Sequence, residues 1–220
     1  LRAEAIEIAS QYRTGPIFTP PSLEGAADGP KGLIQSPGQG GGSNWEGGAV
    51  DVESGVLYVA SVTRPIVRGL FNDREQSDMD FIDARWRLDG PQGLPLTKPP
   101  WGRVTAIDLN TGEHLWMVPN GDTPDFVRNH SALVGVDVPQ TGEARRAGSM
   151  VTSTLLFVAG GGAPWLRVYD KQTGETVTEI ALPAGATGTP MTYMVDDRQY
   201  IVVAVGGPGH PAELVALTAR

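Results

Sequence analysis

The sequence predicts an all-β protein built from repeated antiparallel units, and three observations support this prediction. The 220 residues include 29 glycines and 18 prolines, a composition typical of a chain with many turns but below the range of low-complexity segments. Short stretches of alternating apolar and polar residues recur, each bounded by turn residues. A turn of the form Asp-x-x-Thr-Gly follows such a stretch at Asp108 and again at Asp170. Repeats of this kind indicate a radial or sandwich architecture, in which each unit buries its face on its neighbours.

The chain is expected to begin with a short helix and a long loop. Apolar residues recur at three- and four-residue steps over 1–14, which predicts a helix packed on the flank of the β body. Gly15 and Pro16 should end this helix, because both residue types stop helices. The stretch 15–43 carries too many prolines and glycines for regular structure, so we expect a loop there.

Strands should dominate 44–220, where the repeated turns are expected to be structural. The turns at Asp108 and Asp170 are 62 positions apart, a spacing within the range of propeller blades. In each turn the Asp carboxylate accepts hydrogen bonds from the following amides, and the Gly takes the left-handed conformation that closes the hairpin. A weaker third copy begins at Asp51. The charged, tryptophan-bearing segment 64–100 has no clean period, and we expect an irregular excursion on one face.

Composition excludes several functional classes. The net charge is −8 and the isoelectric point is near 4.8, and we find no clustered basic face, so no nucleic-acid partner is expected. No run of eighteen or more apolar residues occurs, so the sequence predicts no membrane-spanning helix. The chain has no cysteine, which excludes disulfides, thiolate metal sites and a cysteine nucleophile but fits either an oxidising or a reducing compartment.

Seven stretches that span nearly the whole chain occur in the order found in one protein family. They are "FTPPSLEG", "GGGSNWEGGAVDVESGVLYVAS", "GRVTAIDLNTGEHLW", "GSMVTSTLLFVAGGG", "LRVYDKQTGE", "LPAGATGTPMTYMVDDRQYIVVAVGG" and "ELVAL". The chain resembles the C-terminal part of pyrroloquinoline quinone (PQQ)-dependent dehydrogenases, the quinoproteins of the membrane glucose dehydrogenase and alcohol dehydrogenase group. The set is specific, above all "GTPMTY" followed by "QYIVVAVGG".

The resemblance implies an eight-bladed β-propeller of W-shaped, four-stranded sheets, with PQQ and usually Ca²⁺ near the axis at one end. It also implies that electrons pass from a sugar or alcohol to a cytochrome or membrane quinone, and that the protein is periplasmic or extracellular. Eight blades of about 60 residues need roughly 480 residues. We therefore expect 1–220 to be a single domain and a partial β-propeller of about three blades. The rest of the propeller would come from the same, longer chain or from a partner chain.

The start of the sequence agrees with that expectation. It begins at Leu1 without Met and shows no basic-then-apolar signal segment, so we expect a processed form or a piece of something longer. The resemblance places the general base, the stacking tryptophan and the Ca²⁺ ligands in earlier blades. No catalytic residue and no metal ligand is therefore expected in this chain.

Four residues are expected to contact the cofactor. By the resemblance, a glycine-rich loop carries Asn44 and Trp45 toward the quinone; the Asn amide and the indole N–H can donate to carbonyl or carboxylate oxygens, and the ring tolerates a flat contact. The alternative is a tryptophan that plugs the propeller axis beside an asparagine that caps a turn. Gly207 and His210 belong to a turn that resembles a Gly-Gly-His-Gly element reaching the quinone. Here a proline interrupts that element, so a surface histidine is the alternative.

The resemblance also bears on the substrate class. It places a Trp-Gly-Gly element of alcohol-oxidising members where Ala147 and Gly148 stand, which favours a sugar- or polyol-type enzyme.

The acidic stretches are expected to have no site role. The acidic residues near Asp122 and in 72–83 lack the glycine-turned loop with a terminal Glu that binds Ca²⁺, and we expect them to be solvated.

Two further functions remain open beside a PQQ-dependent dehydrogenase segment. One is a non-enzymatic, PQQ-like repeat propeller that serves as a scaffold for other proteins. The other is a sugar-binding β-domain without turnover. The glycine-rich loop at Asn44 and Trp45 and the terminal glycine turn favour the dehydrogenase. We expect this chain alone to be inactive, since it should lack the proton acceptor.

Overall fold

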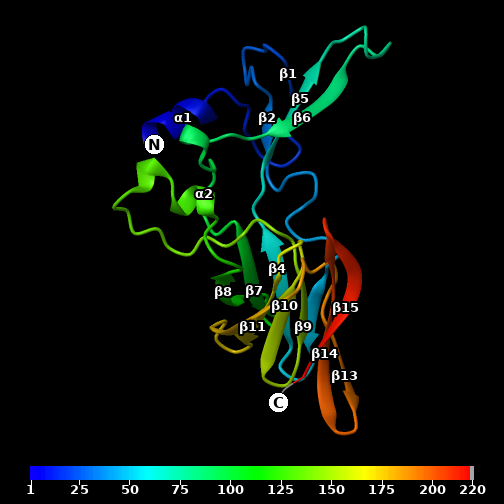
Figure 1. Cartoon of the computed structure of the whole chain (residues 1–220). Coiled ribbons are helices and arrows are strands. Elements are labelled where there is room, and N and C mark those ends of the chain that lie inside the picture. The colour runs from blue at the N-terminus through cyan, green and yellow to red at the C-terminus, as the bar shows by residue number, and fades with distance from the viewer. Residues whose placement is uncertain (219–220) are drawn as a thin grey trace. The chain divides into compact units, whose positions relative to one another are not determined.

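The structure is a computed structural model that describes residues 1–218, and the chain divides into two compact units (Figure 1). The first unit comprises Leu1–Gly41, Thr63–Pro99 and Asp125–Val138. The second comprises Gly42–Val62, Pro100–Pro124 and the described residues from Pro139 onward. The expectation that 1–220 forms a single domain stays a prediction.

The second unit contains three antiparallel sheets whose strands follow one another in chain order, and we call them the first, second and third blades. The first blade has β3 (Gly48–Asp51), β4 (Val56–Val62), β7 (Gly102–Asp108) and β8 (His114–Pro119). The second has β9 (Gly148–Val151), β10 (Leu155–Ala159), β11 (Trp165–Asp170) and β12 (Thr176–Ala181). The third has β13 (Met191–Val195), β14 (Arg198–Gly207) and β15 (His210–Thr218). Two four-stranded blades and a three-stranded one confirm the prediction of about three blades.

The second blade is buried on both faces, which explains its apolar run at β10. Leu156 and Val158 pack into a core shared with the first blade, and Phe157 and Ala159 pack into a core shared with the third. Successive side chains of a strand point to opposite faces, so a strand between two cores must be apolar at every position. The third blade lacks such a cover among the described residues, and every residue of β13 is exposed. The row of blades is therefore open, as expected for an incomplete ring.

The repeated turns have the predicted hydrogen bonds. Asp108 Oδ1 accepts from Asn110 N at 2.8 Å, and Asp170 Oδ1 accepts from Gln172 N at 2.8 Å and from Thr173 N at 2.9 Å. These backbone donors hold the pKa of both carboxyl groups below the ordinary value. Both turns join the third strand of a blade to the fourth. The turn at Asp51 has the same chemistry, since Glu53 N donates to Asp51 Oδ1 and Gly55 has φ +69°, which confirms the weaker third copy. It differs in joining the first strand of its blade to the second.

An ion pair joins the turns of the first and second blades at the end where β3 finishes. Lys171 Nζ lies 2.6 Å from Asp51 Oδ2, and both side chains are nearly buried. Ser54 Oγ also donates to Asp51 Oδ2, at 2.6 Å, while Trp116 Nε1 donates to the carbonyl of Lys171 at 3.2 Å. Hydrogen bonds from Lys171 and Ser54 lower the pKa of Asp51 to about 2.

We expect Lys171→Met to lower the Tm of the full-length protein at neutral pH, because Asp51 loses its cationic partner. Because the pKa of Asp51 is lower in the folded protein than its ordinary value of 3.8, the ionised carboxylate stabilises the fold at pH values above 3.8. This contribution is lost as the pH falls through about 2. The Tm difference between wild type and variant should therefore narrow as pH falls from about 4 to about 2. Thermal scans across this range measure it, with Lys98→Met, an exposed lysine, as the control. A pH-independent difference would contradict the assignment.

The first unit corrects two expectations about loops. The predicted loop 15–43 contains the short strands β1 and β2, and the predicted irregular excursion 64–100 contains β5 and β6. The strands and helices of this unit are β1 (Ser22–Leu23), β2 (Leu33–Gln35), β5 (Ile66–Phe71), β6 (Ile82–Arg87), α1 (Arg2–Ala9), α2 (Asp125–Arg128) and the 3-10 turns η1 (Pro91–Gly93) and η2 (Ser131–Leu133). β5 pairs with β1 in parallel and with β2 and β6 in antiparallel orientation.

Helix α1 is shorter than the sequence predicts. It ends at Ala9 rather than near residue 14, because Ser10 Oγ and Gln11 Nε2 donate to the carbonyl of Glu7 and compete with the helical backbone bonds. None of its side chains is fully buried, whereas Ala5 and Ile8 are partly buried. The predicted packing of its apolar stripe on the β body stays a prediction. Among the described helices, none has the length and hydropathy needed to cross a membrane.

Candidate functional site

The starts of β3, β9 and β13 come together in the second unit, and we call this region the convergent end. β3 and β9 lie side by side. Arg146, just before β9, places its Nε 3.6 Å from Glu46 Oε1, just before β3. Thr189, just before β13, donates from Oγ1 to the carbonyl of Glu46 at 3.4 Å. A Cβ on Gly148 would lie 2.2 Å from Thr189 Oγ1. Glycine at the start of β9 therefore allows the segment before β13 to approach closely.

Asn44 and Trp45 lie in a tight turn at this convergent end. Gly47 N donates to the carbonyl of Asn44 at 2.9 Å, and Gly47 has φ +66°, a conformation that glycine adopts without steric cost. Asn44 is exposed and Trp45 is 95% exposed. The glycines therefore build a turn that presents the indole outward, and the described residues do not enclose the ring.

Glu46, which the sequence analysis did not select, has an unusual carboxylate. Its side chain is 30% exposed, yet its Oε2 atom is buried and has no hydrogen-bond partner among the described residues. A buried acceptor without a donor is costly and is rare in native structures. The one available signal in the sequence is an acidic residue inside a glycine-rich loop beside a tryptophan.

Gly207 and His210 lie at the turn between β14 and β15. Met191, the first residue of β13, pairs with Val202, so the last residues of β14 extend past the start of β13 and the turn lies at the same end of the third blade. A Cβ on Gly207 would meet nothing within 4 Å. His210 Nε2 lies 2.8 Å from Glu213 Oε1, so one ring nitrogen is engaged on its own strand.

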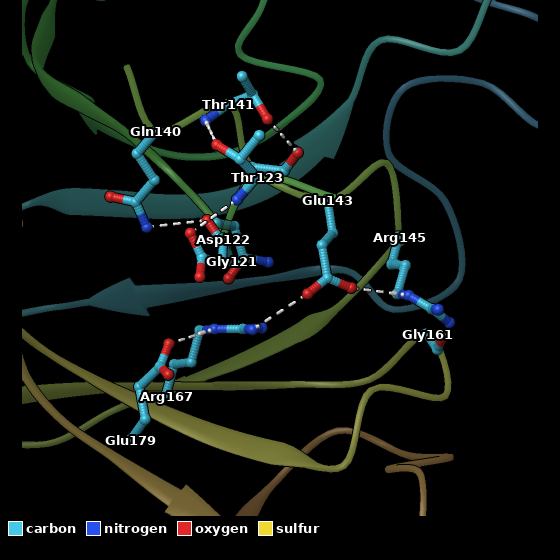
Figure 2. A network of polar contacts seen from close by, with 12 residues as sticks. Gly121, Asp122, Thr123, Gln140, Thr141, Glu143, Arg145, Gly161, Arg167 and Glu179 are labelled. Atoms are coloured by element: carbon cyan, nitrogen blue, oxygen red, sulfur yellow. Dashed lines mark hydrogen bonds and ion pairs between the residues drawn. The ribbon is translucent and has the colours of Figure 1, made fainter. Parts of the chain in front are cut away.

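A polar network around the buried Arg167 lies beside the convergent end, and sequence reasoning missed it (Figure 2). Arg167 on β11 is 6% exposed; its Nε lies 2.7 Å from Glu179 Oε1 and its Nη2 lies 3.4 Å from Glu143 Oε1. Arg145 Nε lies 2.8 Å from Glu143 Oε2, and its Nη1 donates to the carbonyl of Gly161 at 3.0 Å. The network fixes the segment that leads into β9.

Near this network, Tyr169 and Asn120 form a second buried contact. Tyr169 Oη donates to Asn120 Oδ1 at 3.1 Å, and burial raises the pKa of the Tyr169 hydroxyl to about 12. The phenol therefore stays protonated at neutral pH and acts as a structural donor. Arg145, Glu143, Asn120 and Ala147 line a small hollow with Arg167, and its polar groups already bind one another.

The acidic stretches form turns. Asp73 accepts from Glu75 N at 2.9 Å, and Asp122 accepts from Thr123 N at 2.8 Å. Within residues 1–218, no group of three or more His, Cys, Asp or Glu side chains could hold a metal ion. Ala147, where alcohol-oxidising relatives are expected to place an aromatic element, is buried.

Consecutive antiparallel sheets that pack face to face, with their first strands converging, define a partial β-propeller. The family model PQQ, described as "Glucose/ethanol/alcohol dehydrogenase, beta-propeller domain", matches residues 1–201. The chain belongs to this family, which confirms the predicted resemblance and the fold class.

Individual relatives agree with this assignment. Quinoprotein glucose dehydrogenase of Escherichia coli (strain K12) is 32% identical over 224 residues, covering 90% of this chain and 27% of that protein. The glycerol dehydrogenase large subunit of Gluconobacter oxydans (strain 621H) is 28% identical over 220 residues, covering 86% of this chain and 28% of that protein. The chain thus spans about a quarter of the length of these relatives. Because both are dehydrogenases, the comparisons support a dehydrogenase segment and not the scaffold alternative.

A solved structure supports the fold independently. Quinohemoprotein alcohol dehydrogenase from Comamonas testosteroni superposes with a TM-score of 0.53 at 22% identity, covering 79% of this chain and 23% of that chain. At this identity the likeness shows the fold alone. Its agreement with the family match establishes that the three blades are an arc of a propeller.

Proposed function

We propose that the full-length protein is a PQQ-dependent dehydrogenase that oxidises a sugar, polyol or alcohol and delivers electrons to a cytochrome or membrane quinone. The observation that carries this proposal is the convergence of three blade starts around the Asn44–Trp45 turn, in a chain whose family match covers residues 1–201. Ala147 in place of an aromatic element favours a sugar or polyol over methanol.

The residues at the convergent end fit one side of a planar, anionic quinone. Asn44, Trp45 and Arg146 offer an amide, an indole N–H and a guanidinium, which are donors suited to carbonyl and carboxylate acceptors. Open space beside Gly47 and Gly207 leaves room for a flat group. Asn44, Trp45, Gly207 and His210 would hold the cofactor. The His210 nitrogen that Glu213 does not engage can accept a hydrogen bond in the neutral ring and donate one in the imidazolium.

The chemistry would be divided between this chain and other parts of the protein. When bound, PQQ supplies the redox step by accepting the electrons that substrate oxidation releases. This chain would orient the cofactor and shield one side of it, while the proton acceptor and the Ca²⁺ ligands would lie in the remaining blades. These blades, in the same longer chain or in a partner, would cover the exposed face of the third blade. A periplasmic or extracellular location is part of the proposal.

The proposal is tested on the full-length protein with PQQ and Ca²⁺. We expect a quinone absorption band and reduction of an artificial dye with aldoses, polyols or alcohols. Trp45→Ala should raise the Kd for PQQ about tenfold, since an aromatic contact contributes roughly 0.5–1.5 kcal/mol beyond area burial and 1.4 kcal/mol is a factor of ten.

Phe18→Ala is a matched control for Trp45→Ala. Phe18 is 92% exposed, lies in the first unit, and should leave the Kd for PQQ unchanged. No PQQ binding and no dye reduction by the wild-type protein would overturn the proposed function. Equal Kd values for Trp45→Ala and wild type would remove Trp45 from the cofactor site.

A further inference from the structure

Glu46 connects the starts of the first strands of all three blades, β3, β9 and β13. Its backbone leads from Trp45 into β3, its carboxylate lies 3.6 Å from Arg146 before β9, and its carbonyl accepts from Thr189 before β13. Glu46 is therefore placed to set the position of the turn that carries Trp45.

The partner of Glu46 is held on a rigid backbone. A Cβ on Gly161, which has φ +65°, would come 2.6 Å from the carbonyl of Arg146, so the β10–β11 turn packs directly on this residue. The preceding Arg145 is fixed by Glu143 and by the carbonyl of Gly161. These contacts of Arg145 and Gly161, which Figure 2 shows, hold the backbone on both sides of the β10–β11 turn contact. Arg146 therefore presents its guanidinium to Glu46 from a fixed backbone.

The two oxygens of the Glu46 carboxylate have different surroundings. Oε1 faces Arg146, and Oε2 is buried without a partner among the described residues. Because a buried carboxylate oxygen is expensive to keep unpaired, the pair with Arg146 is needed to keep the side chain turned inward. If this pair is lost, we expect the partly exposed Glu46 side chain to rotate further toward water and to loosen the Asn44–Gly47 turn.

We propose that Glu46 is a positioning residue: through its ion pair with Arg146 it fixes the Asn44–Trp45 turn in the orientation that receives the cofactor. This inference rests on the proposed function only for the identity of the cofactor. The pair itself acts in the protein without PQQ, so its effect on Trp45 can be read separately.

The test combines PQQ titration with ¹⁹F NMR of the full-length protein labelled with 5-fluorotryptophan, and Trp45→Phe assigns the Trp45 resonance. In the cofactor-free protein, Glu46→Gln and Arg146→Met should each shift or broaden that resonance and leave the Trp165 resonance unchanged. Each variant should raise the Kd for PQQ about fivefold, which corresponds to a partly exposed ion pair. The Kd of the double variant should not exceed the higher of the two single-variant Kd values, because both substitutions remove the same interaction. Arg146→Lys should restore part of the affinity.

Glu53→Gln is the matched control, because Glu53 is an exposed carboxylate at the opposite end of the same β3–β4 hairpin. It should change neither readout. An unchanged Trp45 resonance in both Glu46→Gln and Arg146→Met would overturn the inference, whether or not PQQ binds. If wild type binds no PQQ while the resonance responds as expected, the proposed function fails and the positioning role stands. If either single variant does not fold, the other tests the same pair.

Discussion

Replacing Arg167 with methionine should lower the free energy of unfolding of the full-length protein by about 3 kcal/mol. The guanidinium is almost fully buried between Glu143 and Glu179. Breaking a buried ion pair from one side costs about 3–5 kcal/mol. We expect the lower end of that range, because the Glu143 and Glu179 side chains are 27% and 41% exposed and can regain water when the cation is removed.

Urea unfolding of wild type and variant measures this loss as a change in midpoint at constant slope. Arg87→Met is the control, since Arg87 pairs with Asp89 at 3.2 Å while both side chains are 74% exposed. Exposed pairs of this kind contribute at most about 1 kcal/mol, so the control should unfold close to wild type. A midpoint for Arg167→Met that matches that of Arg87→Met would show that the buried network does not stabilise the fold.

The parts of the fold that the sequence predicted depend on local chemistry. The turns at Asp108 and Asp170 need only a carboxylate, two following amides and a glycine within five residues, and all of these are visible in the sequence. Local patterns therefore predicted the hairpins and the number of blades.

The parts that were missed depend on contacts between distant segments or on weaker patterns. Arg167 reads as an ordinary polar residue of a strand until the segment with Glu143, 24 positions away, folds over it. The β6 strand does carry a signal, since Ile82, Ala84 and Trp86 alternate with charged residues. The many charged residues of this segment hid the alternation. The packing of the Trp86 ring against Gly69 of β5 joins two separate strands, so it is not visible in the local sequence.

The candidate site was predictable only in part, for the same reason. Residue type and the family resemblance selected Asn44 and Trp45, and neither could reveal that Trp45 would be 95% exposed in this part of the chain. Glu46 acquires its role from Arg146 and Thr189, which lie 100 and 143 positions away. Sequence reasoning can select the loop, whereas the partners of its residues follow from the packing of three blades.

Gly102→Ala should lower the free energy of unfolding by about 3 kcal/mol or more, at least as much as Arg167→Met. A Cβ on Gly102 would lie 1.8 Å from the carbonyl oxygen of Glu143, and a backbone group cannot move aside as a side chain can. Overpacking of this kind typically costs 1–3 kcal/mol and sometimes more. The carbonyl of Gly102 also accepts from Asn120 N at 2.9 Å, and Glu143 N donates to the carbonyl of Asn120 at 2.9 Å. The clash would therefore displace the segment that carries Glu143.

This displacement predicts coupling between two distant substitutions. If Gly102→Ala moves Glu143 away from Arg167, part of the cost of Arg167→Met is already present in the glycine variant. The double variant should then lose about 1 kcal/mol less than the two single losses together, within the range measured for residues in one network. Gly188→Ala is the control, because its Cβ would meet only Ala204 Cβ at 3.5 Å, an ordinary contact. Strict additivity in urea unfolding would mean that Gly102 and Arg167 stabilise the second unit independently, and that the clash is absorbed without moving Glu143.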